Sequence, residues 1–421
     1  MRPSHRGDAV KAGVALCLAL GLAVPALADT AADRFAPKRG FSTATWVEWH
    51  SVADMLSTPG FLDIYPDYAR HLPAGSFARL AQQGFDTVRI AADPSPLLAL
   101  ESTARQDGLL VNLRQRVVEA QAAGLKVILD LHSYPHVGET GDIDAILKTP
   151  AKFAAYLRMV RRVGQRLADL DPDRTALEVM NEPTQDCAAI AANPGTSDWP
   201  VKLAQLHDTA RKAAPKLPLV LSGACWGGSK GLSVLDPAAL HDDNVIWSFH
   251  SYDPFTFTHQ GADWTASPLV FLHGLPYPPT RLTDAEAARL VAEAVARAKA
   301  SKGLIARAAT ERVLAQIVAD YRASSPADLA APIAEAVSWA DAHAIPHDRL
   351  LLEEFGALWF AEAGQKLDPA SHNRFLTAKR EAAEAAGIGW AVWSLSGNFA
   401  IADADFHLYP GVCVALGLTP C

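Results

Sequence analysis

Glutamates that end two apolar runs are the first residues in this sequence that could do chemistry. In "TALEVMNEPTQ", Glu182 follows Asn181 where a strand-like run stops, and in "RLLLEEFG", Glu353 and Glu354 close a second run. A pair of carboxyl groups can divide acid and base work, one protonating a leaving group while the other attacks or activates water. These two sites are therefore candidates for a catalytic pair.

Other polar and aromatic residues stand at the ends of similar runs. They are Trp46, Glu48, Arg89, Asp130, His132, Trp226, His250, Tyr252 and Trp393. Carboxyl groups gathered with imidazoles, an arginine and indoles fit the cleavage of a glycosidic bond, because the indoles offer flat faces to sugar rings. A carbohydrate-binding protein without catalysis is the alternative from another class, but it has little need for both Glu182 and Glu354.

Eight short apolar or β-branched runs must position these residues. They lie at 40–47, 85–91, 125–132, 176–181, 218–224, 244–250, 349–356 and 388–395. Helical patterns separate most of them, which predicts an α/β protein with a parallel sheet. One closed (β/α)8 TIM barrel accounts for eight strands more economically than two open sheets, and it would place catalytic groups at the C-terminal ends of its strands.

A doubly wound sheet is the alternative fold, but no GxGxxG turn follows the early strands, which weighs against its nucleotide-binding form. The longest gap between strands runs from Ser251 to His347. Within it, "TDAE" (283–286) reads as a helix capping box, and Ala-rich helical patterns follow. We expect a helical insertion at about 279–325 after the sixth strand, and we hypothesise that it closes one end of the cleft and favours short or chain-end substrates.

The first 28 residues have the pattern of a signal peptide: a basic start, a short apolar core and a small-residue cleavage site at "ALA". The apolar run is too short to favour the alternative, an uncleaved membrane anchor. Cleavage would leave a single catalytic domain at 29–421. We therefore expect a periplasmic or secreted protein, with no membrane insertion once the signal is removed.

The charge of this remainder narrows the class of partner. The first 28 residues hold three of the 38 Lys and Arg and one of the 46 Asp and Glu, so the remainder has a formal charge of −10. A nucleic-acid partner would require a basic patch, so none is expected. The charge suits a soluble protein with a neutral or cationic substrate. We expect a monomer.

Four cysteines follow the signal region: Cys187, Cys225, Cys413 and Cys421. An even number in an exported chain favours disulfides over free thiols, and the absence of CxxC spacing weighs against a zinc site. Four cysteines allow three pairings. We predict Cys187–Cys225, because the ends of adjacent barrel strands lie close together, and Cys413–Cys421.

The sequence resembles glycoside hydrolase family 5, the cellulase family of the clan that carries its catalytic glutamates on barrel strands four and seven. The resemblance covers about residues 38–400 and rests on six motifs in the family's order: "TVRIA", "VILDLH", "LEVMNEP", "WSFHSYDPF", "LLLEEFG" and "AVWSLSG". It implies a retaining hydrolase of a β-linked glucan, with the β-1,4 linkage as the first expectation. A β-mannan or an exopolysaccharide is the alternative substrate, and no metal or organic cofactor is implied.

The same resemblance implies a role for each matching residue. Glu182 corresponds to the acid/base, Glu354 to the nucleophile, and Asn181 to the amide that binds the sugar 2-hydroxyl. Arg89 and Tyr252 correspond to the groups that hydrogen-bond the nucleophile and keep it ionised. His132 and His250 correspond to imidazoles that line the cleft, and Trp393 to the platform under the sugar at the cleavage point.

The sequence departs from the family pattern in three places. Glu353 stands beside the expected nucleophile, and strand alternation predicts that the two glutamates point to opposite faces. Ser133 replaces a frequent second histidine, and "SLSG" follows Trp393 in place of a further aromatic or acid. Three tryptophans fit either substrate contact or packing: Trp226, Trp264 and Trp359. Glu48 has only its place near the first strand end to recommend it.

Overall fold

The computed structural model describes residues 29–47, 75–133, 142–185, 187–265, 267–301, 303–308, 310–359 and 366–421. The expected signal peptide, Glu48 and the side chain of Trp46 lie outside the described residues. Within the described part of the chain, no helix combines the length and the apolar character needed to cross a membrane.

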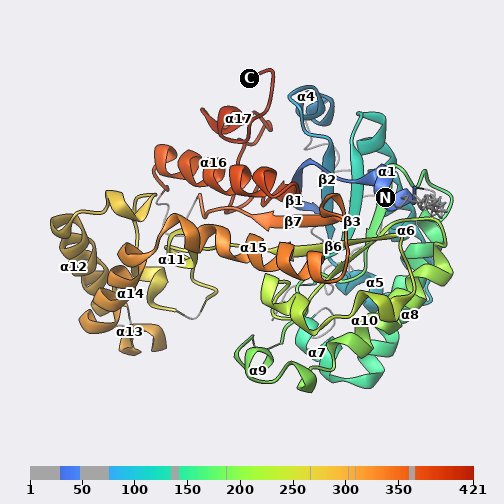
Figure 1. Ribbon diagram of the computed structural model, residues 1–421, viewed down its shortest axis with the longest axis horizontal. Helices are drawn as coiled ribbons and strands as arrows, with labels where there is room; N and C mark the ends of the chain where they lie inside the picture. The colour runs from blue at the N-terminus through green and yellow to red at the C-terminus, as the bar shows by residue number, and fades with distance from the viewer. Residues whose placement is uncertain are drawn as a thin grey trace, which may run out of the picture.

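Eight parallel strands form a closed barrel in chain order (Figure 1), which confirms the predicted TIM-barrel fold. The strands are β1 Arg39–Val47, β2 Thr87–Ala92, β3 Lys126–Leu131, β4 Thr175–Glu178, β5 Leu219–Ser222, β6 Val245–His250, β7 Leu350–Phe355 and β8 Gly389–Val392. Each strand pairs with the next, and β1 pairs with β8 to close the barrel. These strands are buried on both faces, and for this reason their sequences are almost continuously apolar.

The barrel interior changes from apolar to polar along the strands. One cluster joins a residue from each of β3 to β7 with helix α1 (Ala31–Phe35); its members are Ala32, Phe35, Ile128, Ala176, Val220, Ile246 and Leu351. Because side chains alternate along a strand, the residue two positions further on faces the same side. Those residues are Asp130, Glu178, Ser222, Ser248 and Glu353, and all are buried. A polar layer therefore lies towards the C-terminal ends of the strands.

The main helices surround this barrel. They are α4 Ser76–Gln82, α5 Ser95–Ala99, α6 Ala104–Ala122, α7 Ile143–Lys148, α8 Pro150–Leu167, α9 Cys187–Ala192, α10 Trp199–Ala213, α15 Pro326–Ala342, α16 Pro369–Ala385 and α17 Val412–Ala415. Short 3-10 turns lie at η1 Pro194–Thr196, η2 Ser229–Val234, η3 Pro237–Leu240, η4 Pro268–Phe271, η5 Pro279–Arg281 and η6 His347–Arg349. Helix α8 shows why they pack: Phe153, Tyr156, Val160, Val163 and Leu167 recur at helical spacing, and all are buried.

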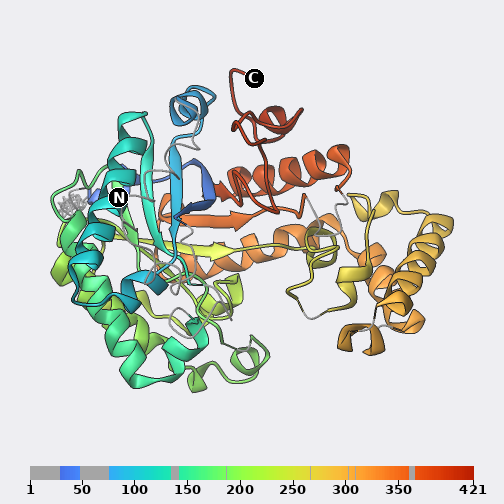
Figure 2. The same cartoon turned by 180° about the vertical axis from the view of Figure 1, so that it is seen from behind.

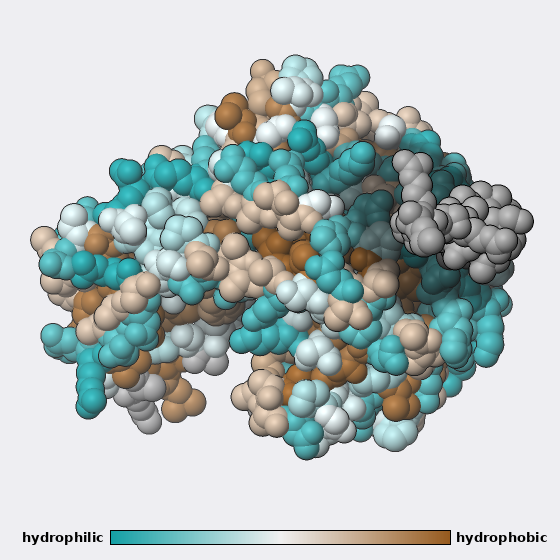
Figure 3. Space-filling view, in the orientation of Figure 1, coloured by the Kyte–Doolittle hydropathy of each residue, from teal (hydrophilic) through white to brown (hydrophobic). Residues whose placement is uncertain are grey.

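The long segment after β6 forms a lobe beyond the C-terminal ends of the strands (Figures 1 and 2). It contains α11 Phe255–Thr258, α12 Asp284–Ala300, α13 Leu304–Ala308 and α14 Glu311–Ala323. The predicted capping box is present at the start of α12, where Thr283 and Glu286 exchange hydrogen bonds. The surface is hollowed between this lobe and the part of the molecule that carries α9 (Figure 3).

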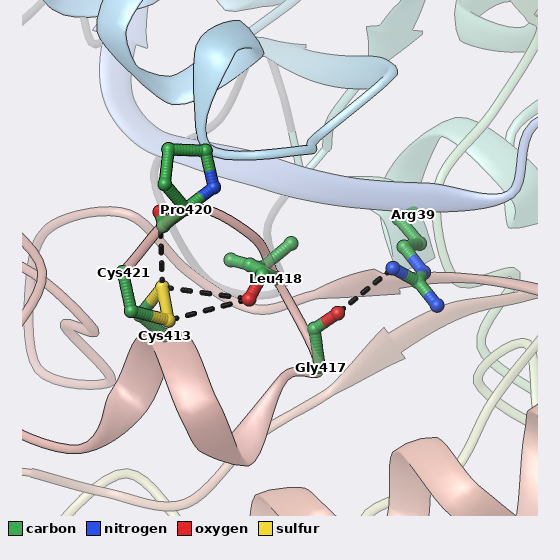
Figure 4. Close-up of a disulfide and its surroundings, with 6 residues drawn as sticks. All are labelled: Arg39, Cys413, Gly417, Leu418, Pro420 and Cys421. Carbon is green, nitrogen blue, oxygen red and sulfur yellow. Dashed lines mark hydrogen bonds between the residues drawn. A yellow bond between two sulfur atoms is a disulfide. The ribbon is translucent and has the colours of Figure 1, made fainter.

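Both predicted disulfides are confirmed. Cys187, at the start of α9, is bonded to Cys225 just after β5, and their Cα atoms lie 4.9 Å apart. Cys413 in α17 is bonded to Cys421, with a Cα separation of 5.6 Å (Figure 4). Nearby, the carbonyl oxygen of Gly417 accepts a hydrogen bond of 2.8 Å from Arg39 on β1, so this segment is also attached to the barrel.

Loss of the two disulfides should reduce stability unequally. The cysteines of the first pair are 38 positions apart and those of the second only 8. A longer loop loses more chain entropy when it is closed, so replacing Cys187 and Cys225 by serine should cost about 4 kcal/mol, against about 2.5 kcal/mol for Cys413 and Cys421. Denaturant titrations of the two double variants measure the difference, and a larger loss for the C-terminal pair would contradict this explanation.

Candidate active site

Arg89 projects from β2 into the polar layer, where its buried guanidinium contacts four carboxylates. Its Nε and Nη2 donate to Glu178 at 2.7 and 2.8 Å, and its Nη1 donates to Glu354 Oε1 at 2.5 Å. Nη2 also lies 2.9 Å from Asp130 Oδ2, and Nε lies 3.3 Å from Glu353 Oε1. These contacts join β2, β3, β4 and β7 around a single cation.

Glu353 and Glu354 both face this cation, so the expectation that they point to opposite faces was wrong. Glu353 follows simple alternation from Leu351 and points into the barrel. The pairing of β6 with β7 shifts register between Phe249 and His250, so that His250 pairs with Glu354. An irregularity of this kind re-aims a side chain next to an active site. It brings Glu354 to the barrel mouth beside Glu353.

The pKa values of the two neighbouring glutamates shift in opposite directions. Burial, together with the charge of Glu178, raises the pKa of Glu353 well above its usual value. Burial acts in the same direction on Glu354, but the positive charges of His250 and Arg89 and the hydrogen bond from Tyr252 outweigh it and lower its pKa. The two shifts run in opposite directions, so the site favours the ionised form of Glu354 and the protonated form of Glu353.

Both oxygens of Glu354 accept hydrogen bonds. Arg89 donates to Oε1, and the hydroxyl of Tyr252, just after β6, donates to Oε2 at 2.8 Å. The side chain is only 4% exposed. These bonds hold the carboxylate in one orientation and favour its ionised form. The structure thus brings Arg89 and Tyr252 to the carboxylate that the sequence predicted they would hold.

Glu182 lies just after β4 in a left-handed backbone conformation, with φ of 42°, and its side chain is 24% exposed. His250 lies between it and Glu354: Nδ1 is 2.9 Å from Glu182 Oε1 and 3.5 Å from Glu354 Oε2. Burial acts to lower the pKa of His250, but the charges of Glu354 and Glu182 raise it to about 9. The side chains of Glu182 and Glu354 therefore both contact one imidazolium at neutral pH.

Glu182, His250 and Glu354 each offer one ligand atom within 4.8 Å of the others. Among the described residues, these three side chains form the group whose atoms could hold a metal ion. The same short separation brings the carboxyl groups of Glu182 and Glu354 close enough to act on one bond.

Asn181, His132 and Trp393 form the wall beside this pair. The side-chain oxygen of Asn181 accepts a hydrogen bond of 2.8 Å from Arg89, and its nitrogen lies 3.3 Å from His132 Nε2. His132 Nδ1 lies 2.5 Å from Asp130, and the imidazole stacks on Trp393 with ring centroids 4.9 Å apart. Burial and the nearby Arg89 charge lower the pKa of His132 to about 4. This wall is therefore largely uncharged, which suits a neutral ligand.

Gly356 explains the glycine of the "EFG" motif. A Cβ built on it would lie 1.9 Å from the carbonyl oxygen of Trp393, so no larger residue fits while that indole keeps its place. Close approach of two backbones is a common reason for a glycine next to a ligand site. Gly356 thus links the position of Trp393 to the strand that carries Glu354.

The three ambiguous tryptophans have different environments. Trp359 is only 6% exposed and stacks on Tyr409, so it is a packing residue. Trp226 and Trp264 are 42% and 51% exposed. The backbone nitrogen of Trp226 donates to the carbonyl of Pro183, which places its backbone beside Glu182.

Sequence reasoning missed Glu178 as part of the site. The sequence does indicate it, because Glu178 is a charged residue inside an apolar strand, and such a residue must be paired when it is buried. Alternation from Ala176 places it on the inner face of β4, where it forms the double hydrogen bond with Arg89.

Comparison with known proteins agrees with this geometry. The family model described as Cellulase (glycosyl hydrolase family 5) matches residues 55–399. Endoglucanase 3 of Fibrobacter succinogenes is 25% identical over 357 residues, covering 80% of this chain and 48% of the relative. Cellodextrinase A of Ruminococcus flavefaciens is 29% identical over 211 residues, covering 47% and 58%. The chain thus spans about half the length of these curated relatives.

Solved structures show the same fold. Cel5A of Thermotoga maritima in complex with cellobiose superposes with a TM-score of 0.58 at 18% identity, covering 91% of this chain and 99% of that one. The same enzyme with mannotriose gives a TM-score of 0.56 at 17% identity, covering 91% and 99%. At this identity the likeness concerns the barrel fold.

The raised pKa of His250 predicts a pH dependence of stability. The pKa of His250 in the folded state is about 9, above the usual 6.5. The imidazolium therefore stabilises the folded state fully below about pH 6.5, and this stabilisation is lost as the pH rises through 9. The difference in unfolding free energy between the wild type and His250→Gln should shrink by on the order of 3 kcal/mol across this window.

Denaturant titrations at pH 6 and pH 9.5 measure this difference. His407→Gln, which removes an imidazole that is 60% exposed, is the control for loss of a histidine as such. A stability difference for His250→Gln that is constant or grows with pH would show that the imidazole is not held as a cation.

Proposed function

Because this chain belongs to glycosyl hydrolase family 5 (cellulase), a family of retaining glycoside hydrolases, we propose that it cleaves a β-linked glucan, with β-1,4-glucan as the first substrate. Membership makes it a cellulase-like β-glycosidase. The proposal further assigns Glu354 as the nucleophile and Glu182 as the acid/base.

The difference in burial and hydrogen bonding between Glu354 and Glu182 supports these roles best. Glu354 is ionised, nearly buried and fixed by two hydrogen bonds, as a nucleophile requires. Glu182 is more exposed, so its carboxyl group can reach a leaving oxygen. Oxygens of the two groups lie within 4.8 Å of one another, which fits the close spacing of retaining enzymes, about 5–5.5 Å, and leaves no room for a water molecule as direct nucleophile.

In the first step, Glu354 attacks the anomeric carbon while Glu182, which enters the step as the protonated acid, gives its proton to the departing glycosidic oxygen. The bond from carbon to that oxygen breaks, and a glycosyl ester of Glu354 forms. In the second step, Glu182 takes a proton from water, whose oxygen attacks the same carbon and releases Glu354. Two inversions at one carbon give net retention.

The other predicted residues would support these steps without exchanging protons. Arg89 and Tyr252 hold Glu354, and the amide nitrogen of Asn181 can donate to the sugar 2-hydroxyl beside the cleaved bond. Trp393 is partly exposed beside His132 and offers a ring face to the sugar. No metal or organic cofactor enters this mechanism.

The substrate rests partly on what the relatives are called. Endoglucanase and cellodextrinase names support a β-glucan. The mannotriose complex of a structural relative keeps β-mannan as the second candidate. Release of reducing sugar from a panel of β-glucans and β-mannans tests the choice. We expect the highest rate on a β-1,4-glucan, and absence of release from every member would overturn the proposed function.

The working environment is proposed on separate grounds. The signal-like first 28 residues and the two disulfides support export to an oxidising compartment, the periplasm or the medium. The negative charge of residues 29–421 supports a monomer that acts on a neutral glycan without a nucleic-acid partner.

Substitution of three glutamates tests the assigned roles. Glu354→Gln should abolish turnover on every substrate, because no other group can form the glycosyl ester. Glu182→Gln should retain the first step on substrates whose leaving groups need no proton, but deglycosylation should be slow. Glu353→Gln should keep a measurable rate, because the raised pKa of Glu353 favours its protonated form and the change preserves the shape of the side chain.

Steady-state and burst kinetics on an aryl β-cellobioside distinguish these outcomes. If the Glu353→Gln enzyme is as inactive as the Glu354→Gln enzyme, the assignment of Glu354 rather than Glu353 as the nucleophile is contradicted. Product analysis by NMR at early times should show the β anomer, whereas an α anomer would contradict the double displacement.

A further inference from the structure

A chain of aromatic rings leads from the candidate nucleophile to the surface. Tyr252, which donates to Glu354, contacts His259 and Phe399 with ring centroids 5.1 and 5.7 Å away. Those two rings in turn contact Trp264, each at 6.2 Å, and Phe255 stacks on His259 at 3.9 Å. We call these five residues the aromatic platform.

The two outer rings of the platform are open to solvent. His259 and Phe399 are each 7% exposed, whereas Phe255 is 46% and Trp264 is 51% exposed. Burial lowers the pKa of His259 to about 3, so the ring beneath them is uncharged. Large apolar side chains that are left exposed around one buried ring, as these two are around His259, are typical of a ligand-binding surface.

The insertion holds this surface in place. Phe255 and Phe257 lie on the same short helix, α11, but Phe257 is fully buried. Its ring packs against Tyr277 at 5.3 Å, Phe375 at 5.5 Å and Tyr321 of α14 at 6.5 Å. The buried ring anchors the helix to the lobe and to α16, and the exposed ring of Phe255 is thereby held against His259, which Trp264 also contacts.

The platform lies where a substrate chain could reach it. Helix α11 stands between the C-terminal ends of the strands and the lobe of α12 to α14 (Figure 1), and the surface beside the lobe is hollowed (Figure 3). Its inner end is Tyr252, at the proposed point of cleavage. A glycan that extends from the catalytic pair over this surface would meet the exposed rings of Phe255 and Trp264.

We propose that Phe255 and Trp264 form a sugar subsite that binds a β-linked pyranose unit beyond the cleavage point. This inference rests on the proposed function, because it takes the same glycan as its ligand. The C–H faces of a pyranose are apolar, so they gain from covering an exposed aromatic ring, while the hydroxyl groups at the ring edge stay in water. The insertion then selects longer chains instead of excluding them, in contrast to the hypothesis drawn from its length alone.

Binding to an inactive enzyme tests the subsite without turnover. In the Glu354→Gln background, calorimetry should show that cellohexaose binds more tightly than cellotriose. Adding Phe255→Ala and Trp264→Ala should reduce this preference by on the order of tenfold, the effect of losing about 1.4 kcal/mol. Leu304→Ala, which removes an exposed side chain of the same lobe, is the matched control and should leave the preference unchanged.

Hydrolysis separates this inference from the proposed function. In the active enzyme, the ratio of kcat/KM for cellohexaose to that for cellotriose should fall by a similar factor in the double variant. Unchanged preferences in both assays, or no binding of either oligosaccharide, would overturn the subsite. Ring-dependent binding by a wild type that hydrolyses no glycan would support the subsite while refuting the proposed function.

Discussion

The guanidinium of Arg89 is the contact on which the catalytic end of the barrel depends. It is fully buried, and it reaches carboxylates on three other strands. Removing one partner of a buried ion pair costs about 3–5 kcal/mol, because the remaining charge is left without compensation. Loss of this one cation would leave several carboxyl groups unpaired inside the barrel. The polar layer and the orientation of Glu354 therefore both depend on Arg89.

One cation cannot neutralise four carboxylates, so the four carboxyl groups differ in how strongly each is held in its ionised form. Burial raises the pKa of Asp130 and of Glu353 well above their usual values, despite the nearby arginine. Glu354 stays ionised because His250 and Tyr252 add to Arg89 at the mouth. When their environments shift the pKa values of neighbouring carboxyl groups in opposite directions, one site can hold both an acid and a base at the same pH.

Much of this arrangement could be predicted from sequence. Eight apolar runs predict the barrel, because strands covered on both faces leave a strong local pattern. The Cys187–Cys225 pair followed from that fold, since ends of adjacent strands are near each other. Glu354 could not be placed by alternation, because the register shift between β6 and β7 depends on strand pairing distant in sequence. The exposure of Trp264 likewise depends on how the insertion packs, which no local pattern records.

Infrared spectroscopy of the carboxyl groups at pH 7 tests the charge difference most directly. Compared with the wild type, Glu353→Gln should lose absorption from a protonated carboxyl group, and Glu354→Gln should lose absorption from an ionised carboxylate. The reverse pattern, with the protonated band lost in Glu354→Gln, would contradict the account of how Arg89 and His250 divide their charge.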